Sequence, residues 1–228
     1  MDILTALAIL PGLVIIAKVY TMDKIEKEPI GLLLLLLALG AVVCFPVAWV
    51  ESALAGILNV TVPRGTFYNL IDNFLCVALI EEGGKYLVTR FCTWRNRAFD
   101  YRFDAIVYAV AAALGFAMLE NCFYVWEGGI QVALMRAVLS VPGHAMFGLF
   151  MGISYGIAKV HQKNGNNAAM RAALWRAVLI PTLIHGFYDF CLSEGTYLSV
   201  GAFYLFMIIL YVVAWKNLKK ASVTDQAI

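Results

Sequence analysis

Two adjacent glutamates and a lysine lie inside an apolar stretch of this chain. Glu81, Glu82 and Lys85 belong to the segment ALIEEGGKYLVTR, and the apolar stretch around them, Phe67–Arg90, is long enough to cross a bilayer as a helix. Each charge at bilayer depth costs at least about 2.5–3.5 kcal/mol by insertion scales. Residues that bear this cost usually face the interior of a helix bundle and mark ion paths, proton relays or chemistry.

Helical spacing allows the lysine to reach both carboxylates. A residue advances about 100° along a helix, so Glu81 and Lys85 lie about 40° apart and Glu82 lies about 60° to the other side of Lys85. One interpretation is a structural ion-pair cluster that closes the bundle. The other is a glutamate poised by its neighbours as a general base toward water. The Gly83–Gly84 pair would let a substrate or another backbone approach closely.

A later apolar segment carries a further buried acid. Glu120 lies one turn beyond a stripe of alanines, which marks close helix contacts in membranes, and Asn121 beside it can hydrogen-bond across helices. Glu120 is therefore expected to face protein, with a carboxylate at the membrane interface as the alternative. Arg136 is expected near the outer end of the next span, where a long side chain can extend to the headgroups.

Two histidines occur in apolar segments that also contain proline. Pro142 lies two residues before His144. His144 continues a row of glycines at i+4 spacing, so its side chain should point into the bundle. The glycines are Gly148, Gly152 and Gly156. Pro181, His185 and Asp189 also follow one another at i+4 steps. Asp189 could therefore hold the His185 ring and fix its tautomer, as carboxylates do for catalytic or metal-bound histidines.

The composition indicates that membrane-spanning helices hold these residues in place. Of the 228 residues, 62% are hydrophobic and only 14% are charged, with a mean hydropathy of +0.81, whereas about 25% charged residues is usual for soluble domains. This excludes an ordinary soluble domain and predicts an all-α, polytopic membrane bundle. The five cysteines form no CxxC pair, so neither a disulfide framework nor a thiolate metal site is expected. We treat residues 1–228 as a single integral-membrane domain.

The apolar runs predict about seven spans. Ser52–Thr66 is expected to be a short connection, with Ser52–Val62 as a possible extra half-helix, and Lys159–Trp175 a polar, basic loop. Pro142 and Pro181 are expected to interrupt the fifth and sixth spans. No basic residue precedes the first run, which argues for a retained span rather than a signal peptide. The expected spans are Ile3–Ala17, Ile30–Val50, Phe67–Arg90, Phe103–Trp126, Gln131–Ala158, Arg176–Cys191 and Tyr197–Trp215.

Basic residues alternate between the connections. In order, the eight extramembrane stretches hold 0, 3, 1, 4, 0, 4, 0 and 3 lysines plus arginines. Cytoplasmic connections carry the excess of these residues in membrane proteins. The pattern predicts an N-terminus outside and a cytoplasmic C-terminus. At about 1.5 Å per residue, Glu81 and His185 lie roughly 13 Å deep from that side, His144 roughly 22 Å and Glu120 deeper. We expect these groups to converge on one buried polar site.

Taken together, the motifs resemble the PrsW family of intramembrane proteases. They are EEGGK at Glu81–Lys85, FAMLEN at Phe116–Asn121, the lone His144, and HGFYD at His185–Asp189. The family is related to CAAX prenyl endopeptidases and bacteriocin-immunity type membrane proteins. The CAAX branch has a histidine where Glu120 stands, which favours the PrsW branch.

The resemblance implies hydrolysis of a peptide bond in or beside the bilayer of a bacterial plasma membrane. Family substrates are single-pass membrane proteins of the anti-sigma-factor kind. Expected roles are Glu81 or Glu82 as base, His144 and His185 as metal ligands or oxyanion donors, and Asp189 as orienting residue. Glu81, His144 and His185 would suit Zn²⁺, with Glu120 a weaker candidate ligand, although a mechanism without metal is equally compatible.

Two other functional classes remain open at this point. In a non-catalytic scaffold or chaperone, the buried polar residues would only hold the helices together. Such a protein would yield no cleavage product. A proton-coupled transporter could use the buried carboxylates and histidines as a relay. The spans show no two-half symmetry, which disfavours the transporter.

Overall fold

The computed structural model describes residues 3–228, and these residues form an all-helical protein, as predicted. The β-type pairing among them is confined to the isolated bridge between Tyr101 and Ala227. The elements, in chain order, are α1 (Ile3–Met22), α2 (Ile30–Thr61), α3 (Thr66–Ile71), the π-helix η1 (Asp72–Ala78), α4 (Leu79–Thr93), α5 (Asp104–Val138), α6 (Ser140–Lys163), α7 (Asn167–Glu194) and α8 (Tyr197–Val223).

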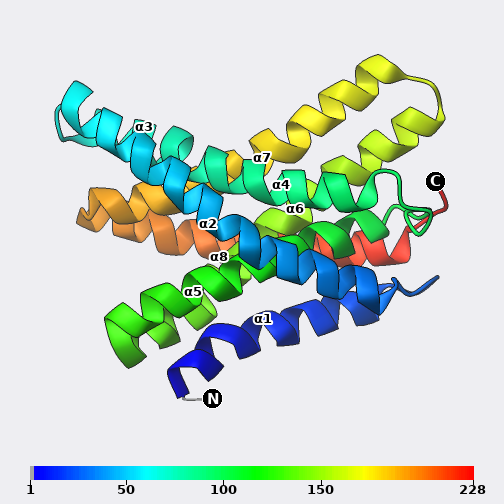
Figure 1. Cartoon of the computed structure of the whole chain (residues 1–228), viewed down its shortest axis with the longest axis horizontal. Helices are drawn as coiled ribbons and strands as arrows, with labels where there is room; N and C mark the ends of the chain where they lie inside the picture. The colour runs from blue at the N-terminus through cyan, green and yellow to red at the C-terminus, as the bar shows by residue number, and fades with distance from the viewer. Residues whose placement is uncertain (1–2) are drawn as a thin grey trace.

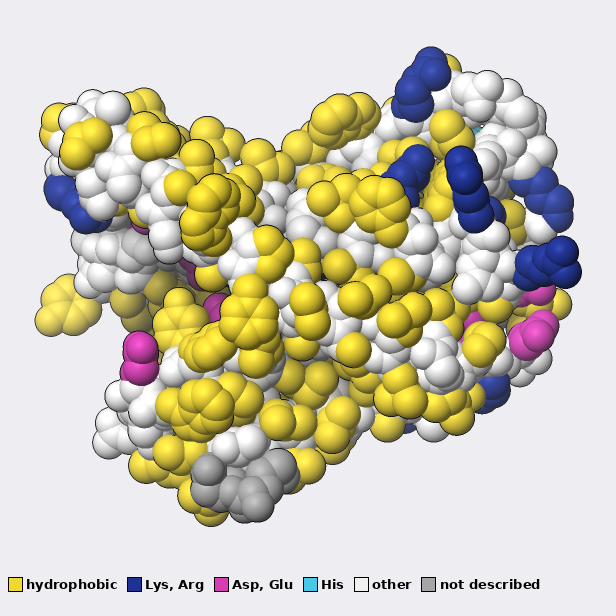
Figure 2. Space-filling model, in the orientation of Figure 1, with side chains coloured by type: hydrophobic (Ala, Val, Ile, Leu, Met, Phe, Trp, Pro, Cys, Tyr) yellow, Lys and Arg dark blue, Asp and Glu magenta, His cyan; other side chains and the backbone are white. Residues whose placement is uncertain are grey.

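The helices lie side by side in one elongated bundle (Figure 1). Four helical stretches among the described residues are long and apolar enough to cross a membrane, namely α1, α2, the α5–α6 stretch and α8. Lysine and arginine side chains gather at the end that holds the C-terminus and the α6–α7 turn, while hydrophobic side chains cover the middle of the molecule (Figure 2). The bundle thus has the surface of a membrane protein; the seven spans and their orientation stay predictions.

The second helix is longer than the sequence suggested. α2 continues to Thr61, so the polar link expected at Ser52–Thr66 was wrong for most of its length, and the alternative of helix at Ser52–Val62 is observed as a continuation of α2. Pro63 lies beyond the last residue of α2, and the hydroxyls of Ser52 and Thr61 donate to carbonyls four residues earlier, at 2.7 Å and 2.8 Å. These local bonds satisfy the hydroxyl groups without ending the helix.

The expected basic loop at Lys159–Trp175 is also mostly helical. α6 runs to Lys163, the turn is confined to residues 164–166, and α7 begins at Asn167. The Asn166 side chain caps α7 by accepting a hydrogen bond from the Ala169 amide at 3.1 Å. α7 then passes through Pro181 without interruption, contrary to the prediction.

The chain reverses direction within α5. Gly129, with φ at 68°, breaks this long helix inside the connection expected between Trp126 and Gln131. A second break follows at Leu139, and Pro142 then lies in the first turn of α6. The predicted interruption at Pro142 was therefore misplaced, because a proline in the first turn of a helix removes no intrahelical hydrogen bond. The Val138 carbonyl accepts its hydrogen bond from the Tyr211 hydroxyl instead.

The core forms around α5, whose residues from Asp104 to Ala117 are all buried. Its alanines let the neighbouring helices approach closely. The glycine row of α6 faces α5 as predicted, since a methyl group added at Gly152 would lie 2.5 Å from the Ile106 Cα. On the other side α2 crosses α5, where Gly40 faces the Ala112 carbonyl and Gly115 faces the Leu37 carbonyl.

Replacing Gly40 by alanine is expected to lower the free energy of unfolding by about 1–3 kcal/mol, because overpacking forces the two backbones apart. The added Cβ would lie 2.2 Å from the Ala112 carbonyl oxygen. Gly56 is the matched control, since it belongs to the same helix and has nothing within 4 Å of an added Cβ. Thermal unfolding of both purified variants in detergent measures the difference, and equal midpoints would contradict the packing described here.

Candidate active site

The two glutamates lie in the first turn of α4, directly after the π-helix η1. π-helical turns are rare and occur frequently at functional sites. η1 is wedged against α7: the Ser193 hydroxyl donates to Asn73 Oδ1 at 3.0 Å, and the ring of Phe74 covers Gly186, where an added Cβ would lie 2.5 Å away. These contacts fix the start of α4 and so the direction of its acidic side chains.

Lys85 binds both glutamates at once. Its ammonium lies 2.8 Å from Glu81 Oε2 and 2.8 Å from Glu82 Oε1, so the shared pairing considered from the sequence is the one observed. Lys85 and Glu82 are completely buried and Glu81 is 5% exposed. The ammonium also lies over the ring of Phe116, at 4.3 Å from its centroid, which adds a cation–π contact.

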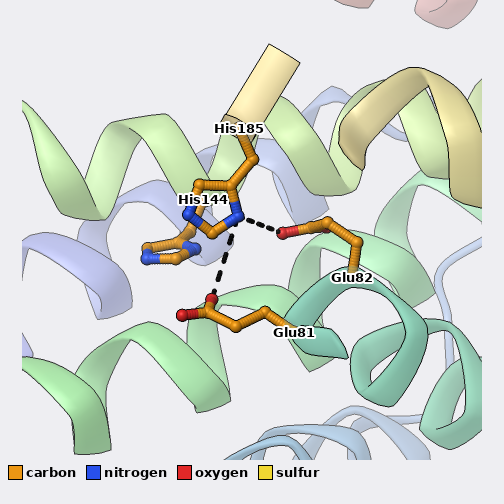
Figure 3. Close-up of side chains that lie close together, drawn as sticks. All are labelled: Glu81, Glu82, His144 and His185. Atoms are coloured by element: carbon orange, nitrogen blue, oxygen red, sulfur yellow. Dashed lines mark hydrogen bonds and ion pairs between the residues drawn. The ribbon is translucent and has the colours of Figure 1, made fainter. Parts of the chain in front are cut away.

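His185 points toward both glutamates of α4 (Figure 3), and its other ring nitrogen contacts an acid on its own helix. Its Nδ1 is 3.0 Å from Glu82 Oε1 and 3.9 Å from Glu81 Oε2, while its Nε2 is 3.0 Å from Asp189 Oδ2. The ring stacks on Phe147 with centroids 4.8 Å apart. The structure thus places Asp189 where the sequence predicted, against the far nitrogen of the imidazole.

His144 connects the lysine to Glu120. Its Nδ1 lies 3.0 Å from the Lys85 ammonium and its Nε2 lies 3.1 Å from Glu120 Oε2. Because an ammonium only donates, Nδ1 accepts and the ring proton resides on Nε2, which donates to the carboxylate. The two imidazole centroids are 5.3 Å apart, so both histidines meet despite the depth difference expected from residue counting.

Arg136 is turned inward, which corrects the prediction that it extends to the headgroups. Its guanidinium lies 2.8 Å from Glu120 Oε2 and covers the ring of Tyr124. Its Nε donates a hydrogen bond to the side-chain oxygen Oδ1 of Asn121. The break at Gly129 folds this part of the chain back along α5, and this reversal brings the arginine to the acid. Glu120 is therefore paired with protein side chains, Arg136 and His144, as expected from the alanine stripe.

A polar cavity of about 250 Å³ opens beside this cluster. Glu81 lines it, whereas Glu82 does not. A water molecule occupies about 30 Å³ in the liquid, so several waters fit within reach of Glu81. The other lining residues include Glu120, His144, His185, Asp189, Asn73, Tyr188 and Ser193.

The site has the donor chemistry of a metal centre. One donor atom from each of Glu81, Glu82, His144 and His185 lies within 4.8 Å of the others. Two imidazoles and a carboxylate form the ligand set of several catalytic zinc sites. Glu82 Oε2 is buried without a hydrogen-bond partner, which leaves a lone pair for a cation. The four residues therefore fit a metal ion, whereas Glu120 stands outside this group as the partner of His144.

One half-buried acid near the site was missed from the sequence. Glu51 of α2 has an oxygen that is buried without a hydrogen-bond partner, and it lies within electrostatic range of Glu81 and Glu120. The sequence interpretation placed Glu51 at the end of a span, where a charge is unremarkable. The apolar run that continues beyond it, to Val60, was the signal that the helix does not end there.

An apolar helical bundle that encloses paired carboxylates, imidazoles and a water-sized cavity places this chain among the membrane-embedded hydrolases. The family follows from comparison with known proteins. Residues 28–215 match the description "PrsW family intramembrane metalloprotease", and the chain belongs to this family. It is a membrane protease, as the sequence motifs predicted.

The similarity extends over almost the whole chain. The protein named Protease PrsW from Oceanobacillus iheyensis is 35% identical, over 97% of this chain and 97% of the relative. Proteins of the same name from Geobacillus kaustophilus and Bacillus subtilis are 33% and 32% identical, covering 96% and 93% of this chain and 92% and 91% of the relatives. No solved structure matches.

Proposed function

We propose that Glu81, Glu82, His144 and His185 form the catalytic centre with which this chain hydrolyses a peptide bond in or next to the membrane segment of a single-pass protein. The observation that carries the proposal is the meeting of these four side chains, from three helices, beside a water-sized cavity. A purely structural ion-pair cluster would need neither the cavity nor the two imidazoles.

The roles follow from exposure to that cavity. Glu81 lines it, and its Oε1 carries no hydrogen bond in the described structure, so Glu81 is the general base toward water. Glu82 is completely buried and positions His185 and Lys85. In a mechanism without metal, His185, held between Glu82 and Asp189, would donate a hydrogen bond to the developing oxyanion, whereas with a metal bound it would be a ligand instead. Lys85, Glu120, Asn121 and Asp189 support these groups.

Zn²⁺ is the proposed metal, because two imidazole nitrogens and carboxylate oxygens are ligands that zinc prefers. His144, His185 and Glu81 would hold it, with Glu82 Oε2 as a further donor. When bound, zinc lowers the pKa of water and polarises the substrate carbonyl. The chain's own part is to orient these ligands, to keep Glu81 beside the water, and to balance the carboxylates with Lys85.

Metal analysis of the purified protein tests this assignment. We expect about one equivalent of zinc in the wild-type chain, none in the His144→Ala/His185→Ala variant, and loss of cleavage after treatment with a zinc chelator. His161→Ala is the matched control, since it removes the third histidine of the chain outside the site. Full cleavage by zinc-free protein would instead establish a glutamate mechanism without metal.

The substrate is proposed to be an anti-sigma-factor-like protein of a bacterial plasma membrane. The clustering of basic side chains at the end with the C-terminus supports seven spans with that end in the cytoplasm (Figure 2). Co-expression with a tagged single-pass substrate tests the activity, and labelling of single cysteines at either end tests the orientation. A scaffold or a transporter would yield no cleavage product under any condition.

A further inference from the structure

A second acidic cluster lies away from the candidate active site, at the end of the bundle that holds the C-terminus. Asp23 and Glu28 come from the α1–α2 turn, and Asp104 is the first residue of α5. One carboxylate oxygen from each lies within 4.8 Å of the others. Their exposed fractions are 2%, 4% and 1%, so all three are nearly inaccessible to solvent.

No basic side chain of the described residues forms an ion pair with this acidic cluster. Lys27 belongs to the same turn, but its ammonium donates to the backbone carbonyls of Tyr20, at 2.8 Å, and of Asp23. The remaining donors are neutral and include the Tyr108 hydroxyl on Glu28 and backbone amides on Asp104.

Two carboxylate oxygens at this end are left without partners. Asp23 Oδ2 is buried with no hydrogen bond, and so is Asp225 Oδ2 in the C-terminal tail. Asp225 is held there by its other oxygen, which accepts from the Phe103 amide at 2.9 Å. Burial, followed by repulsion from Asp23 and Asp100, raises the pKa of Glu28 to about 7. Buried charges in proteins are normally paired or bound to metal ions.

We propose that Asp23, Glu28 and Asp104 bind a divalent cation of the hard, oxygen-preferring class. The available donors are carboxylate oxygens without imidazole or thiolate, the set that suits Mg²⁺, Ca²⁺ or Mn²⁺ rather than Zn²⁺. The ion joins the α1–α2 turn to the start of α5. It is chemically distinct from the Glu/His centre, and its role is to stabilise this end of the bundle.

Thermal unfolding of the full-length protein in detergent tests the cation site. We expect millimolar Mg²⁺, Ca²⁺ or Mn²⁺ to raise the wild-type midpoint by about 5 °C relative to a chelator, as a ligand that binds only the folded state does. Glu28→Gln should abolish this rise while unfolding at a higher temperature than the wild type in chelator, because it removes repulsion. Glu26→Gln, an exposed change in the same turn, should keep the rise.

The same titration in the His144→Ala/His185→Ala background separates the two metal sites. The rise should persist there, and Tb³⁺ bound next to Glu28 should show luminescence excited through Tyr108, whose hydroxyl contacts that carboxylate. Asp23→Asn should lose both signals and serves as the second variant if Glu28→Gln does not fold. The proposal is overturned if none of the three cations changes the unfolding midpoint of the wild type. It is also overturned if the rise is lost in the His144→Ala/His185→Ala variant.

Discussion

Glu81→Gln is expected to slow substrate cleavage by about 10²–10⁴-fold while the protein still folds and accumulates. The amide keeps the shape of the side chain but cannot take a proton from water. Of the two adjacent glutamates, Glu81 lines the cavity and Glu82 does not. Time courses of cleavage of a co-expressed tagged substrate, with the protease level measured in parallel, give the rate.

Two further variants make this result specific. Glu127→Gln changes an exposed glutamate near the α5 break and should leave the rate unchanged. Glu82→Gln removes a completely buried partner of Lys85 and His185, so its main effect should be a lower unfolding temperature. If Glu81→Gln keeps the wild-type rate, the assignment of the base is wrong.

Lys85→Met is expected to lower the free energy of unfolding by about 3–5 kcal/mol, the range for breaking a buried ion pair by removing one partner. The variant would leave Glu81 and Glu82 facing each other without their shared ammonium, and it would remove the donor to His144 Nδ1. Thermal or denaturant unfolding in detergent measures the loss.

A double variant distinguishes lost charge balance from lost packing. Lys85→Met/Glu82→Gln removes the lysine together with one of the carboxylates it neutralises, so it should be more stable than Lys85→Met alone. The coupling between the two sites should exceed the roughly 0.5 kcal/mol seen for independent residues. Additive effects would show that the ion pairs do not hold the centre together.

Membership of the candidate site was largely predictable from charge in apolar segments. Glu81, His144 and His185 were each singled out because a polar group inside a membrane span is costly, and the structure brings all three together. Residue counting placed His144 roughly 9 Å deeper than Glu81, because it treats helices as straight and parallel to the bilayer normal. In the structure the imidazole rings of His144 and His185 nevertheless meet, with centroids 5.3 Å apart.

Helix ends and side-chain partners were less accessible to prediction. Hydropathy marks the part of a helix that lies in lipid, so it could not show that α7 is already helical from Asn167, in a polar segment. Arg136 was misplaced because its position depends on the reversal at Gly129, a long-range consequence of one backbone conformation. The sharing of Lys85 between two acids also depended on rotamers that spacing alone left open.

The π-helical turn η1 changes which residues before and after it share one face of the helix. A turn with i→i+5 bonding accommodates one more residue than an α-helical turn, and one residue corresponds to about 100° of rotation. The part of the helix before Asp72 is therefore out of phase with the part after Ala78, which carries the glutamates. A single helical wheel drawn through Thr66–Thr93 would therefore be correct for the residues on one side of η1 only. On the other side it would be rotated by about 100°, and exposed and interior positions would be confused.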